Sequence, residues 1–146
     1  MSHTHFLYHI VFATKDRMPL IDPKWERNLY GYMGGIVKGY KGSVLEINGM
    51  PDHAHLLARL GPEYAFMDFL RDLKANSSKF VRREHFPKFG WQRRYGAFSV
   101  SESAVPDVRK YIRNQKIHHA DMSFEDEYKS LLRKHGIEFD EEYLWG

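Results

Sequence analysis

The sequence predicts an α+β fold in which one antiparallel β-sheet carries helices on one face. Four short segments rich in β-branched and aromatic residues alternate with longer segments whose apolar residues recur at helical spacing. Their order along the chain is strand, helix, strand, strand, helix, strand and then two helices. A single sheet packed against helices, of the ferredoxin-like or RRM-like type, is the simplest arrangement for that order.

The first half of the chain contains three of the four predicted strands. The expected elements are a strand at Phe6–Thr14, a helix from Asp22 to about Lys38, a strand at Ser43–Asn48 and, after Gly49, a strand that contains His53 and His55. The first strand is rich in β-branched and aromatic residues, which favour a buried central position. The pair Asp22-Pro23 is typical of a helix start, because aspartate caps the first turn and proline fits its first position.

The second half is predicted to be mainly helical. The expected elements are a helix at Tyr64–His85, a loop at Pro87–Tyr95, a strand at Ala97–Ser101, a helix from Ser103 to about His119 and a last helix from Ser123 to Gly136. Ser123 precedes three acidic residues, a pattern that favours a helix N-terminus, and Gly136 favours a helix end.

Length and composition limit the kind of protein. A chain of 146 residues is predicted to form one domain, over residues 1–146. It has no cysteine, which excludes disulfide scaffolds, thiolate zinc sites and cysteine nucleophiles, so a metal site has to use histidine, carboxylate or amide ligands. Neither a signal peptide nor an apolar stretch long enough to cross a membrane is present. We therefore expect a cytoplasmic protein without a membrane partner.

Charge is distributed unevenly along the chain. Residues 65–95 contain eight Lys and Arg against three Asp and Glu, whereas residues 121–146 contain three against eight. A basic surface with interspersed rings suits the phosphates and bases of nucleic acid, although solvated helix faces produce the same pattern. The candidate DNA-binding residues are Lys15, Arg17, Arg71, Lys74, Lys79, Arg82, Arg83, Trp91, Arg93 and Arg94.

Two histidines stand two positions apart in the third predicted strand. Side chains at i and i+2 leave the same face of a strand, so the imidazoles of His53 and His55 are expected to point the same way. Two neutral imidazoles can hold a divalent cation when a third ligand comes from elsewhere. The pair alone is weak support, because the chain has nine histidines and a second such pair, His3 and His5.

A tyrosine and a glutamine follow on the helix after the last predicted strand. Tyr111 and Gln115 stand at i and i+4, one above the other on a helix face. A phenol can act as a nucleophile, and an amide offers a carbonyl ligand. Without the histidines, the preferred explanation of both residues would be a half-buried tyrosine that packs on the core and a glutamine at its rim.

Taken together, these residues resemble the single-tyrosine HUH transposases, the insertion-sequence-200-like group that includes the REP-associated tyrosine transposases. The resemblance covers nearly the whole chain in the right order. The stretches that carry it are Tyr8–Arg17, Met50–Leu57, Tyr95–Ser101, Tyr111–Gln115 and the closing segment that begins Leu-Leu-Arg-Lys-His-Gly.

The resemblance implies the HUH endonuclease fold and a role for each residue. His53 and His55 correspond to the histidines of the HUH motif. Tyr111 corresponds to the nucleophile and Gln115 to the third ligand of a Mg²⁺ or Mn²⁺ ion. The implied activity is transposition and recombination of DNA through a 5′-phosphotyrosine intermediate on a single strand with hairpin ends, at the nucleoid. A homodimer is also implied, in which the tyrosine helix of one subunit serves the histidines of the other.

Three alternatives remain open from the sequence. A domesticated relative would cleave chromosomal repeats instead of moving its own element. A non-catalytic RRM-like module would bind single-stranded nucleic acid by aromatic stacking, but the inner strands lack an RNP-like aromatic pattern. A metal-dependent His-x-His hydrolase would leave Tyr111 and Gln115 without a role.

Overall fold

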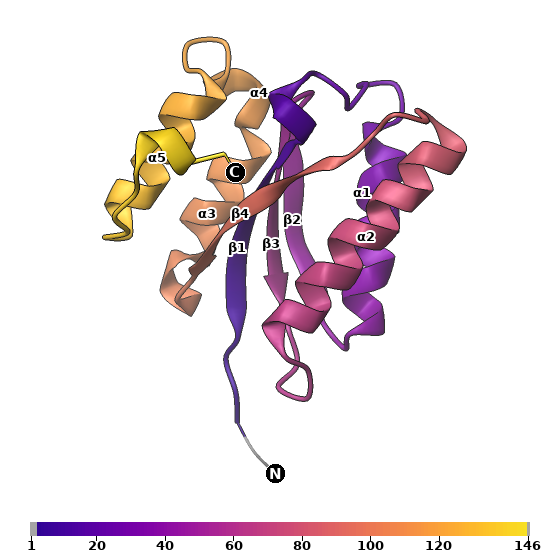
Figure 1. The fold of residues 1–146 in the computed structure, drawn as a ribbon. Coiled ribbons are helices and arrows are strands. Elements are labelled where there is room, and N and C mark those ends of the chain that lie inside the picture. Colours follow the sequence, from indigo (N-terminus) through magenta and orange to yellow (C-terminus); the bar gives the residue numbers. More distant parts are fainter. Residues whose placement is uncertain (1–2, 146) are drawn as a thin grey trace.

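A four-stranded antiparallel sheet forms the centre of the molecule (Figure 1). The computed structural model describes residues 3–145; Met1, Ser2 and Gly146, which belong to the predicted domain, lie outside this range. The strands are β1 (Leu7–Thr14), β2 (Ser43–Met50), β3 (His53–Arg59) and β4 (Trp91–Ser99). They lie in the order β2-β3-β1-β4, and each neighbouring pair is antiparallel. The predicted α+β class with an antiparallel sheet is therefore confirmed.

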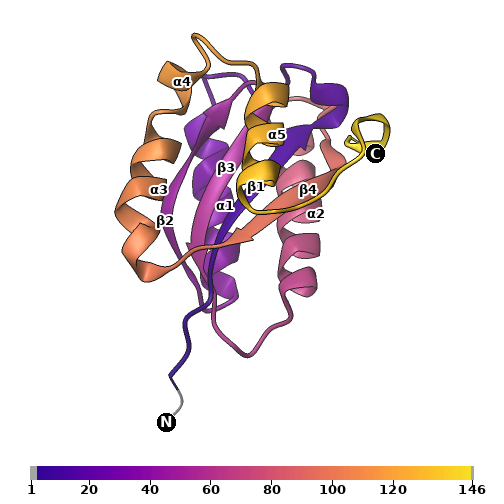
Figure 2. The ribbon, with the colours of Figure 1, turned by 90° about the vertical axis from the view of Figure 1, so that its left-hand side faces the viewer.

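Helices cover both faces of this sheet, whereas the sequence predicts them on one. One face packs against α1 (Glu26–Gly39) and α2 (Phe66–Glu84), and the other against α3 (Val105–Arg113), α4 (Gln115–His118) and α5 (Phe124–Lys134). Figures 1 and 2 show the two groups of helices on opposite sides of the strands. The expectation holds for α1 and α2 and is wrong for the three C-terminal helices.

The central strand β1 explains why both faces are covered. Its residues Ile10 and Phe12 are buried in the core beneath α1 and α2, while Val11 and Ala13 are buried against α5. Because alternate side chains leave opposite faces of a strand, apolar residues at consecutive positions require cover on both sides. The second face is the one that carries the candidate site residues His53 and His55.

The largest error in the predicted elements concerns β4. The segment Pro87–Tyr95 is predicted to be a loop, but β4 begins at Trp91 and pairs with β1 as far as Thr14. Trp91 and Tyr95 pack against the core beneath α2, while the residues between them are polar. Because Arg93 and Arg94 are consecutive and exposed on an edge strand, this segment lacks the alternation of apolar and polar residues by which a strand is predicted.

The helix boundaries also differ from the predicted ones. Asp22 and Pro23 form a turn before α1, in which Asp22 Oδ1 accepts a hydrogen bond from the Lys24 amide. The predicted helix from Ser103 to His119 is divided at Asn114, whose backbone is not helical. The expected cap of α5 is confirmed, because the Asp126 amide donates to Ser123 Oγ. None of the helices among residues 3–145 has the length and apolar character needed to cross a membrane.

Candidate active site

The two histidines of β3 lie side by side on the sheet face covered by the C-terminal helices. His53 and His55 are fully buried, and their ring centroids are 5.1 Å apart. Ala54 and Leu56, at the alternate positions, point into the core beneath α1 and α2. As the alternation predicts, both imidazoles leave the same face of the strand.

Tyr111 and Gln115 reach these histidines from two short helices. Tyr111 lies in the last turn of α3, and Gln115 is the first residue of α4. The buried Gln115 side chain places its Oε1 2.9 Å from Nε2 of His53. The Tyr111 ring centroid lies 5.8 Å from that of His55. The four site residues singled out in the sequence therefore meet in one place.

Glu127 of α5 lies at the centre of this group and is missed by the sequence reasoning. It is 1% exposed, and its carboxylate accepts hydrogen bonds from the Tyr111 hydroxyl and from Gln115 Nε2, the latter at 2.7 Å. Nε2 of His55 lies 3.1 Å from its Oε1. The sequence carries a signal for this residue, because Glu127 falls within the apolar stripe formed by Phe124, Tyr128 and Leu131.

Two further side chains, Asp52 and His9, orient the histidines. Nδ1 of His53 lies 2.7 Å from Oδ1 of Asp52, which leaves Nε2 directed toward Gln115 and Glu127. Nδ1 of His55 lies 2.8 Å from Nε2 of the buried His9 of β1. Partners of this kind fix the tautomer and the ring orientation of a ligand histidine.

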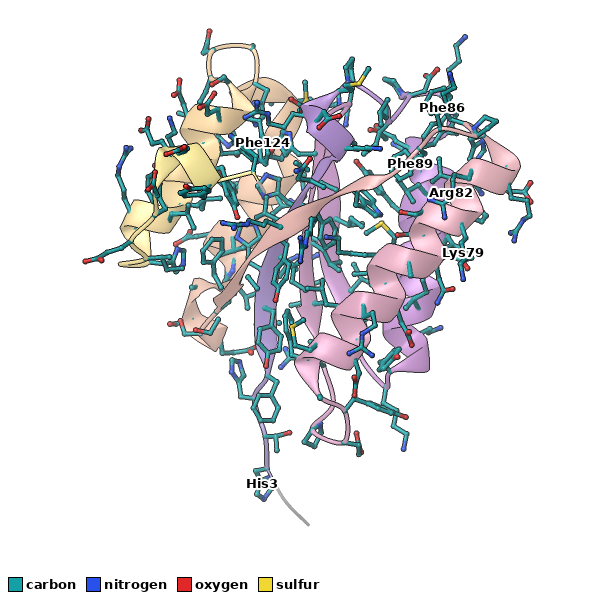
Figure 3. The ribbon with its side chains drawn as sticks, viewed as in Figure 1. His3, Lys79, Arg82, Phe86, Phe89 and Phe124 are labelled. Carbon is teal, nitrogen blue, oxygen red and sulfur yellow. The ribbon has the colours of Figure 1, made fainter. Side chains whose placement is uncertain are left out.

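Aromatic packing holds the His53 ring from the side of α5. The Phe124 ring stacks on it with centroids 4.0 Å apart and an interplanar angle of 14°. Phe124 is the first residue of α5, and Figure 3 shows it on the side of this helix nearest the strands. His119 closes the group, with Nε2 2.9 Å from Oε1 of Glu127.

Burial and hydrogen bonding shift the pKa values of these groups in different directions. Burial lowers the pKa of His55 to about 4. For His53, burial acts in the same direction, but hydrogen bonds to Asp52, Glu127 and Gln115 outweigh it and raise the pKa. Burial and the hydrogen bond to Glu127 raise the pKa of Tyr111 above its ordinary value of 10.0.

The carboxylate at the centre behaves in the opposite way to an isolated buried acid. Burial alone would raise the pKa of Glu127, but hydrogen bonds from His53, His55 and Tyr111 hold it well below its usual range. Glu127 is therefore ionised at neutral pH, and Tyr111 faces it as a neutral phenol.

The donor set suits a divalent cation that prefers nitrogen and oxygen ligands. Ligand atoms of His53, His119 and Glu127 lie within 4.8 Å of one another. The carbonyl oxygen of Gln115 faces the same nitrogen of His53 as Glu127 does. The lone pairs of Nε2 of His53 and of these two oxygens would repel one another at such short distances unless a proton or a cation lies between them. Imidazole, carboxylate and amide donors of this kind fit a divalent cation.

A cavity of about 370 Å³ opens beside the tyrosine. It lies between the end of β4 and helices α3 and α5, and Tyr111 and His9 form part of its wall. Asp107, Lys134 and His135 add polar groups to the lining. The nucleophilic candidate can thus be reached from outside, although the histidines behind it are buried.

Six of the ten candidate DNA-binding residues line a cleft of about 470 Å³ between α2 and β4, on the other face of the sheet. Figure 3 shows two of its residues, Lys79 and Arg82, projecting from α2. The six residues are Arg71, Lys74, Lys79, Arg82, Trp91 and Arg93. Nζ of Lys74 is held by the carbonyl oxygens of Gln92 and Arg93, at 2.6 and 2.9 Å, and burial lowers the pKa of Lys74.

The other four candidates lie outside the walls of this cleft. The Arg17 guanidinium stacks over the Trp145 ring at 4.4 Å, and Arg94 donates to the Tyr143 carbonyl oxygen. Lys15 follows β1, where its amide pairs with the backbone of Gly90. Arg83 pairs with its neighbour Glu84 at 2.8 Å. The structure therefore brings together four of the five candidates on α2 and two of the three on β4, but not the complete set.

The family model described as "Transposase IS200 like" matches residues 2–115, a range that includes both histidines, Tyr111 and Gln115. The chain belongs to the IS200-like transposase family. This IS200-like transposase is thus an enzyme that cleaves DNA, and the predicted resemblance is confirmed.

Relatives of this IS200-like transposase agree in sequence and in fold. It is 29% identical to the ISDra2 transposase TnpA of Deinococcus radiodurans over 115 residues, which cover 74% of this chain and 82% of that protein. The crystal structure of a candidate transposase from Deinococcus radiodurans R1 is similar with a TM-score of 0.60 and 25% identity, covering 78% of this chain and 93% of the other.

A third protein shares the fold at lower sequence identity. The structure of a REP-associated tyrosine transposase bound to a REP hairpin is similar with a TM-score of 0.63 and 12% identity, covering 82% of this chain and 73% of the other. The predicted HUH fold is therefore confirmed for this IS200-like transposase.

Proposed function

We propose that this transposase cleaves and rejoins single-stranded DNA through a covalent 5′-phosphotyrosine at Tyr111. We further propose that His53, His55 and Gln115 hold the Mg²⁺ or Mn²⁺ ion that the reaction uses. The observation that supports both is the convergence of these four side chains, from β3, α3 and α4, on one buried carboxylate.

The chemistry of the proposed reaction follows from the phenol and the phosphodiester. Oη of Tyr111 forms a bond to the scissile phosphorus, the bond to the 3′ oxygen breaks, and that oxygen leaves as a 3′-OH while the phenol gives up its proton. A bound divalent cation acts as a Lewis acid that offsets the charge on the non-bridging phosphate oxygens. The phosphotyrosine is still a phosphodiester, so a 3′-OH can reverse the step and join strands without ATP.

The surroundings of Tyr111 keep the phenol neutral until the substrate arrives. Its pKa is raised by burial and by the ionised carboxylate of Glu127, so little phenolate exists at neutral pH. The scissile strand enters through the cavity beside Tyr111, whose wall includes this side chain. Reaction is thus coupled to the positioning of a phosphate next to the histidines.

We propose a DNA strand with a hairpin end as substrate, acted on in the cytoplasm at the nucleoid. A REP hairpin is the ligand of one structural relative, and the cleft between α2 and β4 offers cations for a phosphate backbone and the ring of Trp91 for stacking. Lys15, Arg17, Arg83 and Arg94 would extend this surface. A homodimer belongs to the proposal as well; within the described chain, Tyr111 lies beside the histidines of its own subunit.

A covalent-adduct assay tests this function. The protein is incubated with end-labelled hairpin-bearing single strands and Mg²⁺ or Mn²⁺, and the products are separated on a denaturing gel. We expect a DNA–protein adduct that is absent with Tyr111→Phe and with His53→Ala, although both variants retain most of the hairpin binding. Tyr143→Phe is the matched control, because Tyr143 is exposed and lies in the C-terminal segment.

The same assay separates the proposal from its alternatives. An adduct that persists in Tyr111→Phe would show that another group is the nucleophile. Binding without an adduct on every strand tested, including the sequences that flank the reading frame, would indicate a non-catalytic nucleic-acid-binding module. Cleavage restricted to dispersed chromosomal repeats would indicate a domesticated nuclease.

A further inference from the structure

Glu127 is a buried carboxylate for which the proposed reaction has so far given no role. It lies on α5 among the apolar residues that attach this helix to the sheet, and it is 1% exposed. A carboxylate at such a position loses its hydration, and it persists only where other polar groups replace the water. The polar groups that take the place of water around Glu127 all belong to the candidate active site.

The two oxygens of Glu127 contact different sets of partners. Oε1 lies among three imidazole nitrogens, at 2.9 Å from Nε2 of His119, 3.1 Å from Nε2 of His55 and 3.3 Å from Nε2 of His53. Oε2 accepts the hydroxyl of Tyr111 and, at 2.7 Å, the amide nitrogen of Gln115. One oxygen therefore faces the ligand nitrogens, and the other holds the nucleophile and the amide.

The hydrogen bond from Gln115 decides which end of its amide faces the histidines. An amide has two donors on nitrogen and an acceptor on oxygen, and only the oxygen is a metal ligand. Because Oε2 of Glu127 binds the nitrogen, the oxygen is turned toward Nε2 of His53, 2.9 Å away. The hydrogen bond to Glu127 thus orients Gln115 so that its carbonyl oxygen, the atom that can bind a metal, points toward His53.

We propose that Glu127 is an additional, anionic ligand of the metal, through Oε1, and that its Oε2 positions Tyr111 and Gln115. This inference rests on the proposed function, which supplies the metal. Imidazoles and an amide are neutral donors, whereas Mg²⁺ and Mn²⁺ prefer at least one charged oxygen. A carboxylate shared in this way links the nucleophile directly to the metal ligands, so that both are aligned by one side chain.

Manganese affinity of the purified full chain tests the ligand role without reference to activity. Titration calorimetry or the EPR signal of free Mn²⁺ gives the affinity for wild type, Glu127→Gln and Glu125→Gln. We expect Glu127→Gln to bind Mn²⁺ at least about 10- to 100-fold more weakly, because even the loss of a group that only supports a ligand has an effect of that size. Glu125→Gln is the matched control, because it removes the same charge from an exposed position of the same helix and should bind as wild type does.

Adduct formation tests the positioning role. Glu127→Asp keeps the charge but is shorter by one methylene, so it cannot hold the metal and Tyr111 together. We expect this variant to bind Mn²⁺ within about tenfold of wild type and to form the Tyr111 adduct at least ten times more slowly. Folding of Glu127→Gln is checked by circular dichroism in EDTA. If this variant does not fold, the test is whether Glu127→Asp retains Mn²⁺ affinity while it forms the adduct more slowly.

The outcomes separate this inference from the function on which it rests. Wild-type Mn²⁺ affinity in folded Glu127→Gln overturns the ligand role, and a wild-type adduct rate in Glu127→Asp overturns the positioning role. If wild type itself neither binds Mn²⁺ nor forms an adduct, the proposed function fails first. If wild type does both while Glu127→Gln binds Mn²⁺ normally, only the role of Glu127 is lost.

Discussion

The depressed pKa of His55 predicts that the metal-free protein loses stability in mild acid. Burial lowers this pKa from 6.5 to about 4, so between these two pH values the unfolded chain binds about one proton more at His55 than the folded protein does. The free energy of unfolding therefore falls as pH falls below 6.5. A difference of about 2.5 in pKa corresponds to about 3 kcal/mol, lost in full only near pH 4.

The other buried groups with shifted pKa values change the free energy of unfolding in different pH ranges. Burial also lowers the pKa of His9, which adds to the loss over the same range. The raised pKa of His53 acts above pH 6.5, where its stabilising contribution disappears as pH rises through the folded value. The low pKa of Glu127 matters only below its ordinary value of 4.5, where the stability that it contributes is lost. The range from pH 6.5 to 4.5 therefore reports on His55 and His9.

Urea unfolding followed by tryptophan fluorescence in EDTA measures this effect. Wild type, His55→Asn and the control His3→Asn, which alters an exposed histidine, are compared at pH 7.5, 6.5, 5.5 and 4.5. We expect the unfolding free energies of wild type and His3→Asn to fall in parallel, and that of His55→Asn to fall by about 2–3 kcal/mol less. A loss in His55→Asn as large as in wild type would show that His55 is not held neutral by burial.

Four other outcomes follow from the structure. Phe124→Ala removes the ring that stacks on His53 and should lower the unfolding free energy by about 3–5 kcal/mol in urea titrations, whereas loss below 1 kcal/mol would contradict tight packing there. Gly49→Ala would place a methyl group against the His53 carbonyl oxygen and should cost about 1–3 kcal/mol or more. Lys79→Ala should weaken hairpin binding and reduce its log–log salt slope by about 1, unlike Lys24→Ala, which lies outside the cleft. Chelation with EDTA should abolish the covalent adduct, and added Mn²⁺ should restore it; an adduct in EDTA would exclude the metal requirement.

The site residues that the sequence reveals are those set by local periodicity. The i, i+2 spacing of His53 and His55 determines their common face once β3 is a strand. Tyr111 and Gln115 still lie over the histidine pair despite the break at Asn114, because Gln115 contacts His53 and the Tyr111 ring lies beside His55. In these cases a few neighbouring residues decide where the side chains point.

The residues that the sequence reasoning misses depend on contacts between distant segments. Glu127 resembles part of an acidic helix start, and only the packing of α5 against β3 reveals that its stripe position is buried. His9 is one of several residues in a buried strand, and its partner His55 comes from another strand. The position of α3, α4 and α5 on the second face could have been inferred from the apolar residues on both sides of β1.

The location of Glu127 on α5 has a consequence for the order in which the site is completed during synthesis. Glu127 follows His55 by 72 positions, and chains emerge from the ribosome with their N-terminal part first. A nascent chain that has released β3 and α3 already contains both histidines and Tyr111, but not the carboxylate that contacts them. With the proposed role of Glu127, the phenol of Tyr111 would be aligned only after α5 has been made and has docked on the sheet.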